Sequence, residues 1–535
     1  MSGVVVAPQP EAAEAGAEIL KAGGNAVDAA IGCALVQTAV DPFMCGIAGF
    51  GSCQVFVPGG AHEVIDFHGR APLRTRPDMW QDLIRAETED GFGFVLEGRV
   101  NEIGYLSVTA PMTLAAFDHA LRAHGTMPLA ALLEPAIAWA EEGFLVRPAV
   151  HDYWTSAPAA GRVPHPEYVL RHPATRAIHA SPEGGIRPVG DRVRNPDMAR
   201  TYRRIAAHGV RDFYEGEIAR EIAADFAANG GLLGLEDLAA VAPVVGAPLE
   251  GRYRGLRVTT NPPPGGGVQV LEMLNILESF DLAAMGHGSA DHVATLAEVM
   301  KIATIDKDAK VGDPAFVDVP VAELTSKAYA AAHAEDIRAG RRAHVRRYNP
   351  GGAESPDTTH VVVVDASGMA VTMTHSIGMP SGVVTPGLGF MYNGCMGAFD
   401  PRPGRAGSLA PGKARFTAMA PTLLFDDHGP VFAVGAPGGT KISMAVMQAI
   451  VNAVDFGMSA ADAVSAPRVL ALSDTLDLSN RALHSVEREL NARGYRTRRS
   501  PRSHDFASPH AARRRPDGSW QGGADPGRDG MAVEV

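Results

Sequence analysis

The character of this 535-residue sequence changes abruptly near residue 358. Before that point the sequence predicts strands at 46–60 and 63–67, and helices at 10–22, 25–41, 114–146, 201–229, 271–280, 297–310 and 323–340. After it, Val- and Thr-rich runs joined by short polar turns predict two hairpins, at 358–374 and 421–435, and then a helix at 441–455. Any fold for this chain must therefore join a helix-rich first two-thirds to a hairpin-rich last third.

Two stretches give no regular pattern. Residues 155–194 are rich in Pro, His and Arg and predict irregular surface structure. The tail from Ser500 is polar, contains the run Arg513–Arg515, and receives no helix or strand prediction.

The charge balance limits the partners that this chain can bind. Its 48 Lys and Arg residues face 60 Asp and Glu residues, a formal net charge of −12. Nucleic acids and anionic membranes select a surplus of basic residues, so neither is expected as the main partner. Aromatic residues make up only 6% of the chain, which also argues against RNA binding by base stacking. With 46% hydrophobic residues, the chain can bury a full core, which excludes global disorder.

Targeting and metal-binding signals are weak. The first eight residues lack the basic start and the long apolar run of a secretory signal, and no stretch approaches the roughly 20 apolar residues of a membrane helix. A cytoplasmic location is therefore expected. The four cysteines match no zinc-binding spacing, so buried free thiols are expected. The 19 histidines form no metal-binding motif, and neither a metal nor a cofactor is predicted.

The segment Asp357–His360 lies between a loose stretch at 348–355 and an abrupt strand. A threonine hydroxyl is a poor nucleophile without an adjacent base. Cleavage of the chain before a threonine supplies that base, because the freed α-amino group has a pKa of about 7.7–8.0. This chemistry needs an exposed loop in front of a rigid strand, and the junction before Thr358 offers both. An ordinary turn before a strand is the alternative interpretation.

Short motifs spread from residue 18 to 468 resemble the γ-glutamyltransferase family of N-terminal-nucleophile hydrolases. Each motif is weak alone, but their shared order along the chain is specific. They are Glu18–Ala30, His124–Leu129, Asn229–Leu232, Glu236–Leu238, Asn261–Gly265, Gly312–Pro314, Thr358–His360, Pro437–Gly439 and Ala466–Arg468.

The resemblance implies an α+β fold, the four-layer αββα sandwich of this hydrolase type, with Thr358 starting a central strand. It also implies self-cleavage, in which the Thr358 hydroxyl attacks the carbonyl of Asp357. The products would be a large chain of residues 1–357 and a small chain, 358–535, formed by the remaining 178 of the 535 residues. The two fragments are expected to form one intertwined heterodimer, and further oligomerisation is left open.

The resemblance also implies roles for three residues besides the nucleophile. Ser376 falls where the family has a second hydroxyl near the nucleophile. Gly438 and Gly439 match the glycine pair whose backbone N–H groups form the oxyanion hole, where the absence of a side chain lets the backbone approach closely. The alternatives are a surface serine at a strand end and an ordinary turn after a strand.

The substrate-binding positions depart from the family pattern on the carboxylate side. His68 stands where typical members bind the glutamyl α-carboxylate with an arginine, and Arg70 is the expected substitute. A basic, Gly- and Pro-rich segment offers further cations that could meet an anionic acyl group or remain solvated: Arg402, Arg405, Lys413 and Arg415.

The positions that align with the ammonium-binding side chains of the family differ even more from the family pattern. Gly378, Cys395 and Ala398 align with the side chains that hold the α-ammonium group, and none of them carries a carboxylate. Thr417 and Ala418 replace the paired serines of the family, and Thr359 and Thr417 are further substrate-binding candidates. A partly buried ammonium without its carboxylate costs several kcal/mol of binding free energy. This pocket is therefore expected to discriminate poorly, or inversely, between γ-glutamyl and glutaryl amides.

The leading prediction is a self-cleaving amidohydrolase or acyltransferase that cleaves γ-glutamyl or related small amides such as glutathione, with water or an amine as acceptor. One alternative is an amidase for acyl groups that lack the α-ammonium, such as oxamate-like or glutaryl-type amides. Another is a non-catalytic binding protein derived from the family, which the intact Thr358, Thr359, Gly438 and Gly439 disfavour.

Overall fold

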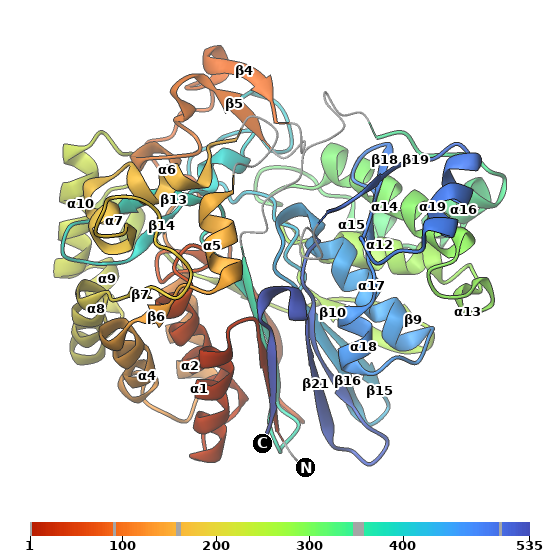
Figure 1. Cartoon of the computed structure of the whole chain (residues 1–535), viewed down its shortest axis with the longest axis horizontal. Coiled ribbons are helices and arrows are strands. Elements are labelled where there is room, and N and C mark those ends of the chain that lie inside the picture. The colour runs from red at the N-terminus through yellow and green to blue at the C-terminus, as the bar shows by residue number, and fades with distance from the viewer. Residues whose placement is uncertain (1–2, 89–92, 157–161, 346–357, 502–505) are drawn as a thin grey trace.

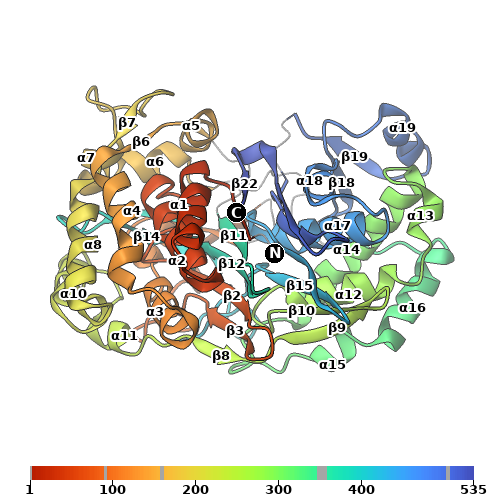
Figure 2. The same ribbon diagram turned by 90° about the horizontal axis from the view of Figure 1, so that it is seen from below.

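Two large β-sheets stacked face to face form the centre of the molecule, and helices cover both outer faces (Figure 1). The computed structural model describes residues 3–88, 93–156, 162–345, 358–501 and 506–535. In the view from below, α1, α2, α4 and α8 lie on one side of the paired sheets, and α12, α14 and α17 lie on the other (Figure 2). The predicted α+β, four-layer αββα sandwich is confirmed.

The first sheet has seven strands in which every neighbouring pair is antiparallel. Its order is β22 (Met531–Glu534), β1 (Val4–Ala7), β11 (Thr359–Val364), β12 (Ala370–Ser376), β2 (Phe50–Phe56), β3 (His62–Phe67) and β8 (Val244–Gly246). Val5 pairs with Val363 on one side and with Val533 on the other. The two ends of the chain therefore lie side by side in this sheet (Figure 1).

The second sheet has six strands, also antiparallel throughout. Its order is β21 (Trp520–Ala524), β20 (His510–Arg514), β16 (Gly429–Gly435), β15 (Thr422–Asp426), β10 (Leu256–Thr260) and β9 (Leu249–Tyr253). Valines of β1 and β11 form one buried cluster with Leu423, Phe425 and Trp520 of this sheet. The apolar inner faces of the two sheets thus hold the layers together.

The helix α2 (Ala26–Val40) is buried along its whole length, because it packs between the first sheet and the outer helices α1 (Pro10–Lys21) and α4 (Leu129–Glu142). Asn25 caps it as predicted. The Asn25 side chain accepts hydrogen bonds from the N–H groups of Val27 and Asp28, and the Asp28 carboxylate accepts the Asn25 N–H at 2.9 Å.

The remaining elements complete the outer layers and the rims. The helices are α3 (Thr113–His124), α5 (Pro148–Thr155), α6 (His165–Leu170), α7 (Pro173–His179), α8 (Pro196–His208), α9 (Arg211–Tyr214), α10 (Glu217–Ala228), α11 (Leu235–Ala239), α12 (Gly267–Leu277), α13 (Leu282–Met285), α14 (Ala290–Lys310), α15 (Val321–Leu324), α16 (Lys327–Arg338), α17 (Ile442–Val454), α18 (Ala460–Ser465) and α19 (His484–Ala492). The small sheets contain β4 (Ile84–Glu87), β5 (Phe94–Leu96), β6 (Phe144–Leu145), β7 (Arg192–Val193), β13 (Pro380–Val384), β14 (Met391–Asn393), β17 (Val469–Leu470), β18 (Thr475–Leu478) and β19 (Arg496–Arg499).

The prediction of irregular surface structure at 155–194 was wrong for the part between residues 165 and 179. It contains α6 and α7, and His165, Tyr168 and His179 on these helices are buried. Proline in the first turn of each helix explains the error, because proline at that position starts a helix instead of breaking it.

The polar tail also contributes to the core of the fold. It supplies β20 and β21 to the second sheet and β22 to the first. Ala511 and Ala512 are fully buried, and the backbone of Gly523 lies so close to Ala460 that a Cβ atom would come within 2.3 Å of its carbonyl. Small residues let this tail pack closely, although its sequence has no hydrophobic alternation.

The four cysteines are free and buried, as expected. None of the helices in the described ranges combines the length and the apolar character required to cross a bilayer.

Candidate active site

Thr358 directly precedes β11, a strand held on both sides in the middle of the first sheet. The residues Val361–Val364 of this strand are completely buried, so the strand is a rigid support. Thr358 itself is 2% exposed. Its neighbour in the chain, Asp357, lies outside the described residues.

A pocket opens at Thr358 and brings together segments that are distant in the sequence. Eight of the residues singled out from the sequence line it: Thr358, Gly378, Cys395, Ala398, Arg415, Thr417, Ala418 and Gly439. Its other lining residues are Arg162, Met379, Gly394, Gly397, Met419 and Ile442. The positions aligned with the α-amino-acid clamp of the family therefore share one cavity with the candidate nucleophile.

Gly438 and Gly439 form the turn that leads from β16 into α17. Both have positive φ angles, 142° and 59°, and Gly439 lies at the pocket wall. A Cβ atom on Gly438 would lie 2.4 Å from the Cβ of Ala507, so no larger residue fits there. Backbone N–H groups at the start of a helix suit a developing negative charge, and Gly439, just before α17, lines the same pocket as Thr358.

Ser376 ends β12 and is completely buried, so it is not the surface serine of the alternative interpretation. Its hydroxyl oxygen accepts a hydrogen bond from the N–H of Gly378 at 2.7 Å. Gly378 has a φ of 62°, and a Cβ atom there would lie 3.0 Å from Cys395 Sγ and 3.7 Å from Arg415 Nη2. Ser376 thus shapes a turn whose bare glycine leaves room in the pocket.

Two arginines line the pocket. The guanidinium carbon of Arg415 lies 4.5 Å from the centre of the Phe50 ring, a stacking arrangement that orients the group. Arg162 pairs with the buried Glu102 carboxylate at 3.1 Å. None of the lining residues that the structure describes carries a carboxylate.

The neighbouring His68 and Cys395 side chains carry no charge at pH 7. Burial, together with the positive charges of Arg415 and Arg70, lowers the pKa of His68 to about 3, so the imidazole is neutral at pH 7. Burial raises the pKa of Cys395 to about 11, against the opposing effect of Arg415. Neither residue therefore supplies a charge for the substrate, and His68 is not among the lining residues.

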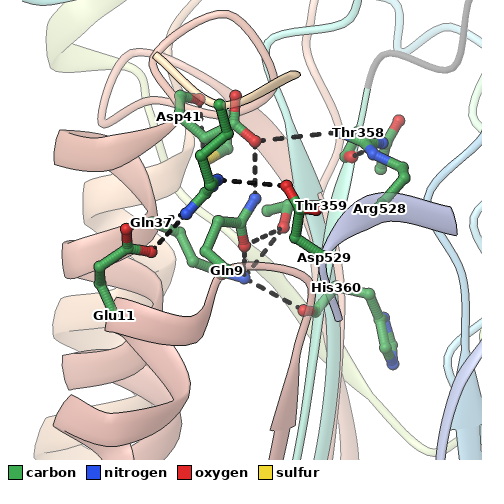
Figure 3. A network of polar contacts seen from close by, with 11 residues as sticks. Gln9, Glu11, Gln37, Asp41, Thr358, Thr359, His360, Arg528 and Asp529 are labelled. Carbon is green, nitrogen blue, oxygen red and sulfur yellow. Dashed lines mark hydrogen bonds and ion pairs between the residues drawn. The ribbon is translucent and has the colours of Figure 1, made fainter. Parts of the chain in front are cut away.

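Other predicted substrate-binding residues lie outside the pocket wall. Arg70 is bridged through its backbone to Ala110 and Ala414, and its side chain donates a hydrogen bond to the Gly412 carbonyl at 3.3 Å. Thr359 points towards α2, where its hydroxyl accepts a hydrogen bond from Gln37 at 2.9 Å (Figure 3). Of the four basic residues between 402 and 415, Arg415 alone appears among the described lining residues.

A polar network next to Thr358 was not predicted from the sequence. Arg528, in the tail, donates a hydrogen bond from Nη1 to the Thr358 carbonyl oxygen at 3.0 Å (Figure 3). Its Nη2 lies 3.8 Å from the carboxylate of Asp41 at the end of α2. Gln37, a polar residue inside a mostly apolar helix, was a signal in the sequence that could have pointed to this network.

No group of three or more His, Cys, Asp or Glu side chains suited to a metal ion occurs among the residues that the structure describes.

Comparison with known proteins gives one consistent family. The family model described as Gamma-glutamyltranspeptidase matches residues 12–535. The Acylase ACY 1 proenzyme of Pseudomonas sp. (strain V22) is 40% identical over 536 residues, covering 100% of this chain and 93% of the relative. The Glutathione hydrolase proenzyme of Escherichia coli (strain K12) is 34% identical over 482 residues, covering 87% and 80%.

Solved structures agree with this result. The cephalosporin acylase from Bacillus halodurans superposes with a TM-score of 0.87 at 30% identity, covering 99% of this chain and 95% of that chain. The gamma-glutamyltranspeptidase of Helicobacter pylori gives a TM-score of 0.56 at 30% identity, covering 62% and 90%.

Proposed function

This chain belongs to the gamma-glutamyltranspeptidase family, and we propose that Thr358 is its nucleophile. The protein is an enzyme, an amidohydrolase of the N-terminal-nucleophile type. The place of Thr358 supports the proposed role, because the residue starts a buried central strand and lines the pocket together with Gly439.

The first proposed reaction is self-cleavage between Asp357 and Thr358. The Thr358 hydroxyl attacks the Asp357 carbonyl, so that the peptide C–N bond breaks, an ester forms and the nitrogen becomes a free amine. Water then hydrolyses the ester and releases the Asp357 carboxylate. Both the acylase and the glutathione hydrolase relatives are named proenzymes, which supports a mature enzyme of two fragments.

In the proposed turnover, the free amine of Thr358 accepts the hydroxyl proton while Oγ attacks the substrate amide. The N–H groups of Gly438 and Gly439 stabilise the negative charge on the carbonyl oxygen. The leaving amine takes the proton as its bond to the acyl carbon breaks. Water or an acceptor amine then attacks the acyl-enzyme ester, and the acyl group leaves as a carboxylic acid or a new small amide.

We propose that the preferred acyl group carries a carboxylate but no α-ammonium. The observation that supports this most strongly is the pocket at Thr358, where Arg415 and Arg162 line the wall and no described lining residue carries a carboxylate. An ammonium group entering this pocket would lose its hydration and gain no anionic partner. The similarity to two proteins named acylases over nearly the whole chain supports an acylase activity.

Hydrolysis of γ-glutamyl amides such as glutathione is the second candidate activity. It would use the same Thr358 and the same glycine pair, and the name of the Escherichia coli relative favours it. In both candidates Arg415 would bind the carboxylate of the acyl group, so the two differ only in how the pocket treats the ammonium.

A matched pair of substrates separates the two candidates. Glutaryl and γ-glutamyl p-nitroanilides differ only in the α-ammonium group, and kcat/KM is measured for both with the mature protein. We expect the glutaryl amide to be hydrolysed at least as efficiently as the γ-glutamyl amide. In Ala398→Asp the ratio should move towards the γ-glutamyl amide, because the new carboxylate restores an ion pair. A strong wild-type preference for the γ-glutamyl amide would contradict the proposed acyl specificity.

A further inference from the structure

We propose that Arg528 is a positioning residue that holds Thr358 in its reactive orientation through the Thr358 backbone carbonyl. Asp41 in turn holds the Arg528 side chain. This proposal rests on the proposed function in one respect, the assignment of Thr358 as nucleophile. It assigns a role to the C-terminal tail, for which the sequence suggested none.

The contacts place Arg528 between the nucleophile and the end of a buried helix. Its guanidinium donates to the Thr358 carbonyl oxygen at 3.0 Å and lies 3.8 Å from the Asp41 carboxylate (Figure 3). The side chains of Arg528 and Asp41 are only 10% and 7% exposed, so water hardly competes for these contacts. The guanidinium also lies near the carboxyl end of α2, where the helix dipole favours a positive charge.

A chain of hydrogen bonds connects Asp41 to the sheet itself. The Asp41 carboxylate accepts a hydrogen bond from Gln9 at 2.8 Å, and Gln9 accepts one from Gln37 at 2.7 Å. Gln37 contacts Thr359 at 2.9 Å and His375 at 2.7 Å, which places the network against β11 and β12. Because α2, its C-terminal cap, the segment before α1 and both strands contribute, the Asp41 carboxylate that faces Arg528 is held from several sides.

Self-cleavage makes this support necessary. In the intact chain, peptide bonds restrain Thr358 on both sides, but in the mature enzyme its nitrogen is a free terminus. Chain termini are poorly ordered unless another group holds them. The one peptide plane that remains at Thr358 carries the carbonyl that Arg528 binds, so this hydrogen bond restrains both the amine and Oγ. A misplacement of about 1 Å at a reacting group can cost about 10²-fold in rate.

A purely structural role of the tail is the competing explanation, and Arg147 provides a control for it. Arg147 anchors the same tail through Asp529 at 3.3 Å and pairs with Glu11 at 2.6 Å. No contact between Arg147 and Thr358 is recorded in the described part of the chain. Loss of Arg147 therefore weakens the attachment of the tail and leaves the hydrogen bond to the Thr358 carbonyl in place.

The experiment compares Arg528→Ala with Arg147→Ala, using mature protein and glutaryl p-nitroanilide. For Arg528→Ala we expect kcat to fall by about 10²-fold with KM little changed, and self-cleavage of freshly folded precursor to slow as well. Guanidinium ion at sub-denaturing concentration should restore part of the lost kcat. For Arg147→Ala we expect a lower Tm and a kcat within threefold of wild type. Such a change in kcat corresponds to a change in activation free energy on the order of RT.

Three results would overturn the proposal: a mature Arg528→Ala enzyme with a kcat within threefold of wild type, an equal loss of kcat in Arg147→Ala, or no response to guanidinium. If Arg528→Ala does not fold, Arg528→Gln is measured against the same limits, since it keeps the side-chain length and removes the charge. The variant Thr358→Ala distinguishes a failure of the proposed function from a failure of the role proposed for Arg528. If Thr358→Ala retains turnover, the proposed function fails; if it is inactive while Arg528→Ala resembles wild type, only the role of Arg528 fails.

Discussion

At the scale of single residues, the proposed acyl specificity depends on the charge of Arg415. The sequence indicated Arg415 as one of several basic candidates, but only the structure shows that it lines the pocket and that its guanidinium stacks on Phe50. The structure also shows that the adjacent residues Thr358 and Thr359 face different surroundings. Successive side chains point to opposite faces of a strand, so the second threonine turns towards Gln37 and away from the pocket.

Arg415→Gln should weaken the binding of a carboxylate-bearing acyl group. A charged hydrogen bond contributes about 1.5–3 kcal/mol, so kcat/KM for glutaryl p-nitroanilide should fall by about 10- to 100-fold, mainly through KM. Butyryl p-nitroanilide lacks the carboxylate and serves as the control, with little change expected. Equal losses for both substrates would mean that Arg415 maintains the pocket without binding the carboxylate.

Gly438→Ala should disturb the proposed oxyanion site. The new Cβ would meet Ala507 at 2.4 Å, and a φ of 142° is unfavourable for alanine. Loss of one oxyanion donor costs about 10²–10³ in kcat, and a decrease of that size is expected in steady-state assays. Gly457→Ala is the matched control, because its φ is 65° and nothing lies within 4 Å of a Cβ there. A Gly438→Ala enzyme with normal kcat would refute the assignment.

At the scale of elements, the sequence predicted those that carry their own local signals. Asn25 marked the start of α2, and Val- and Thr-rich runs around short polar turns marked the hairpins β11–β12 and β15–β16. It could not predict β1 or β22, because these four-residue strands are stabilised by partners hundreds of residues away. Gly209 and Gly216 likewise divide the helix predicted at 201–229 into three.

His179, on helix α7, should make the free energy of unfolding depend on pH. Burial lowers the pKa of His179, which packs against Phe43 and Trp154, from 6.5 to about 3. Because the pKa of His179 is lower in the folded state than in the unfolded state, the contribution of this residue to the free energy of unfolding is complete above about pH 6.5. It is lost as the pH falls towards 3, at about 1.4 kcal/mol per pH unit. His179→Leu should therefore lose less unfolding free energy than wild type between pH 6.5 and 5.

Urea unfolding at both pH values measures this difference. His208→Gln is the control, because His208 is exposed at the end of α8, and it should follow the wild-type curve. If His179→Leu and wild type lose equal free energy on acidification, His179 does not resist protonation in the folded state.

At the scale of the whole molecule, the order of the strands explains how one chain can be cut and remain one structure. In the first sheet, β11 and β12 lie between β1 and β2, so strands from after residue 358 are inserted between strands from before it. The second sheet likewise pairs β15 with β10. Fragments that share both sheets cannot separate without exposing the common core, so we expect them to remain associated after cleavage.

The site depends on the same interleaving. Thr358, Arg415 and Gly439 come from the C-terminal third, while Arg162 and Asp41 come from the region before residue 358. Family motifs, whose shared order along the chain is specific, indicated the proposed catalytic positions. No local pattern could reveal that the tail residue Arg528 meets Asp41, because the contact joins the two ends of the chain.

The most direct test of the account identifies the acylated residue. Mature protein is mixed with glutaryl p-nitroanilide, quenched in acid and digested, and the peptides are sequenced by mass spectrometry. The account predicts a small fragment that begins Thr-Thr-His-Val, with the glutaryl group on its first residue, Thr358. A single uncut chain that still turns over substrate, or a glutaryl group on any other residue, would contradict it.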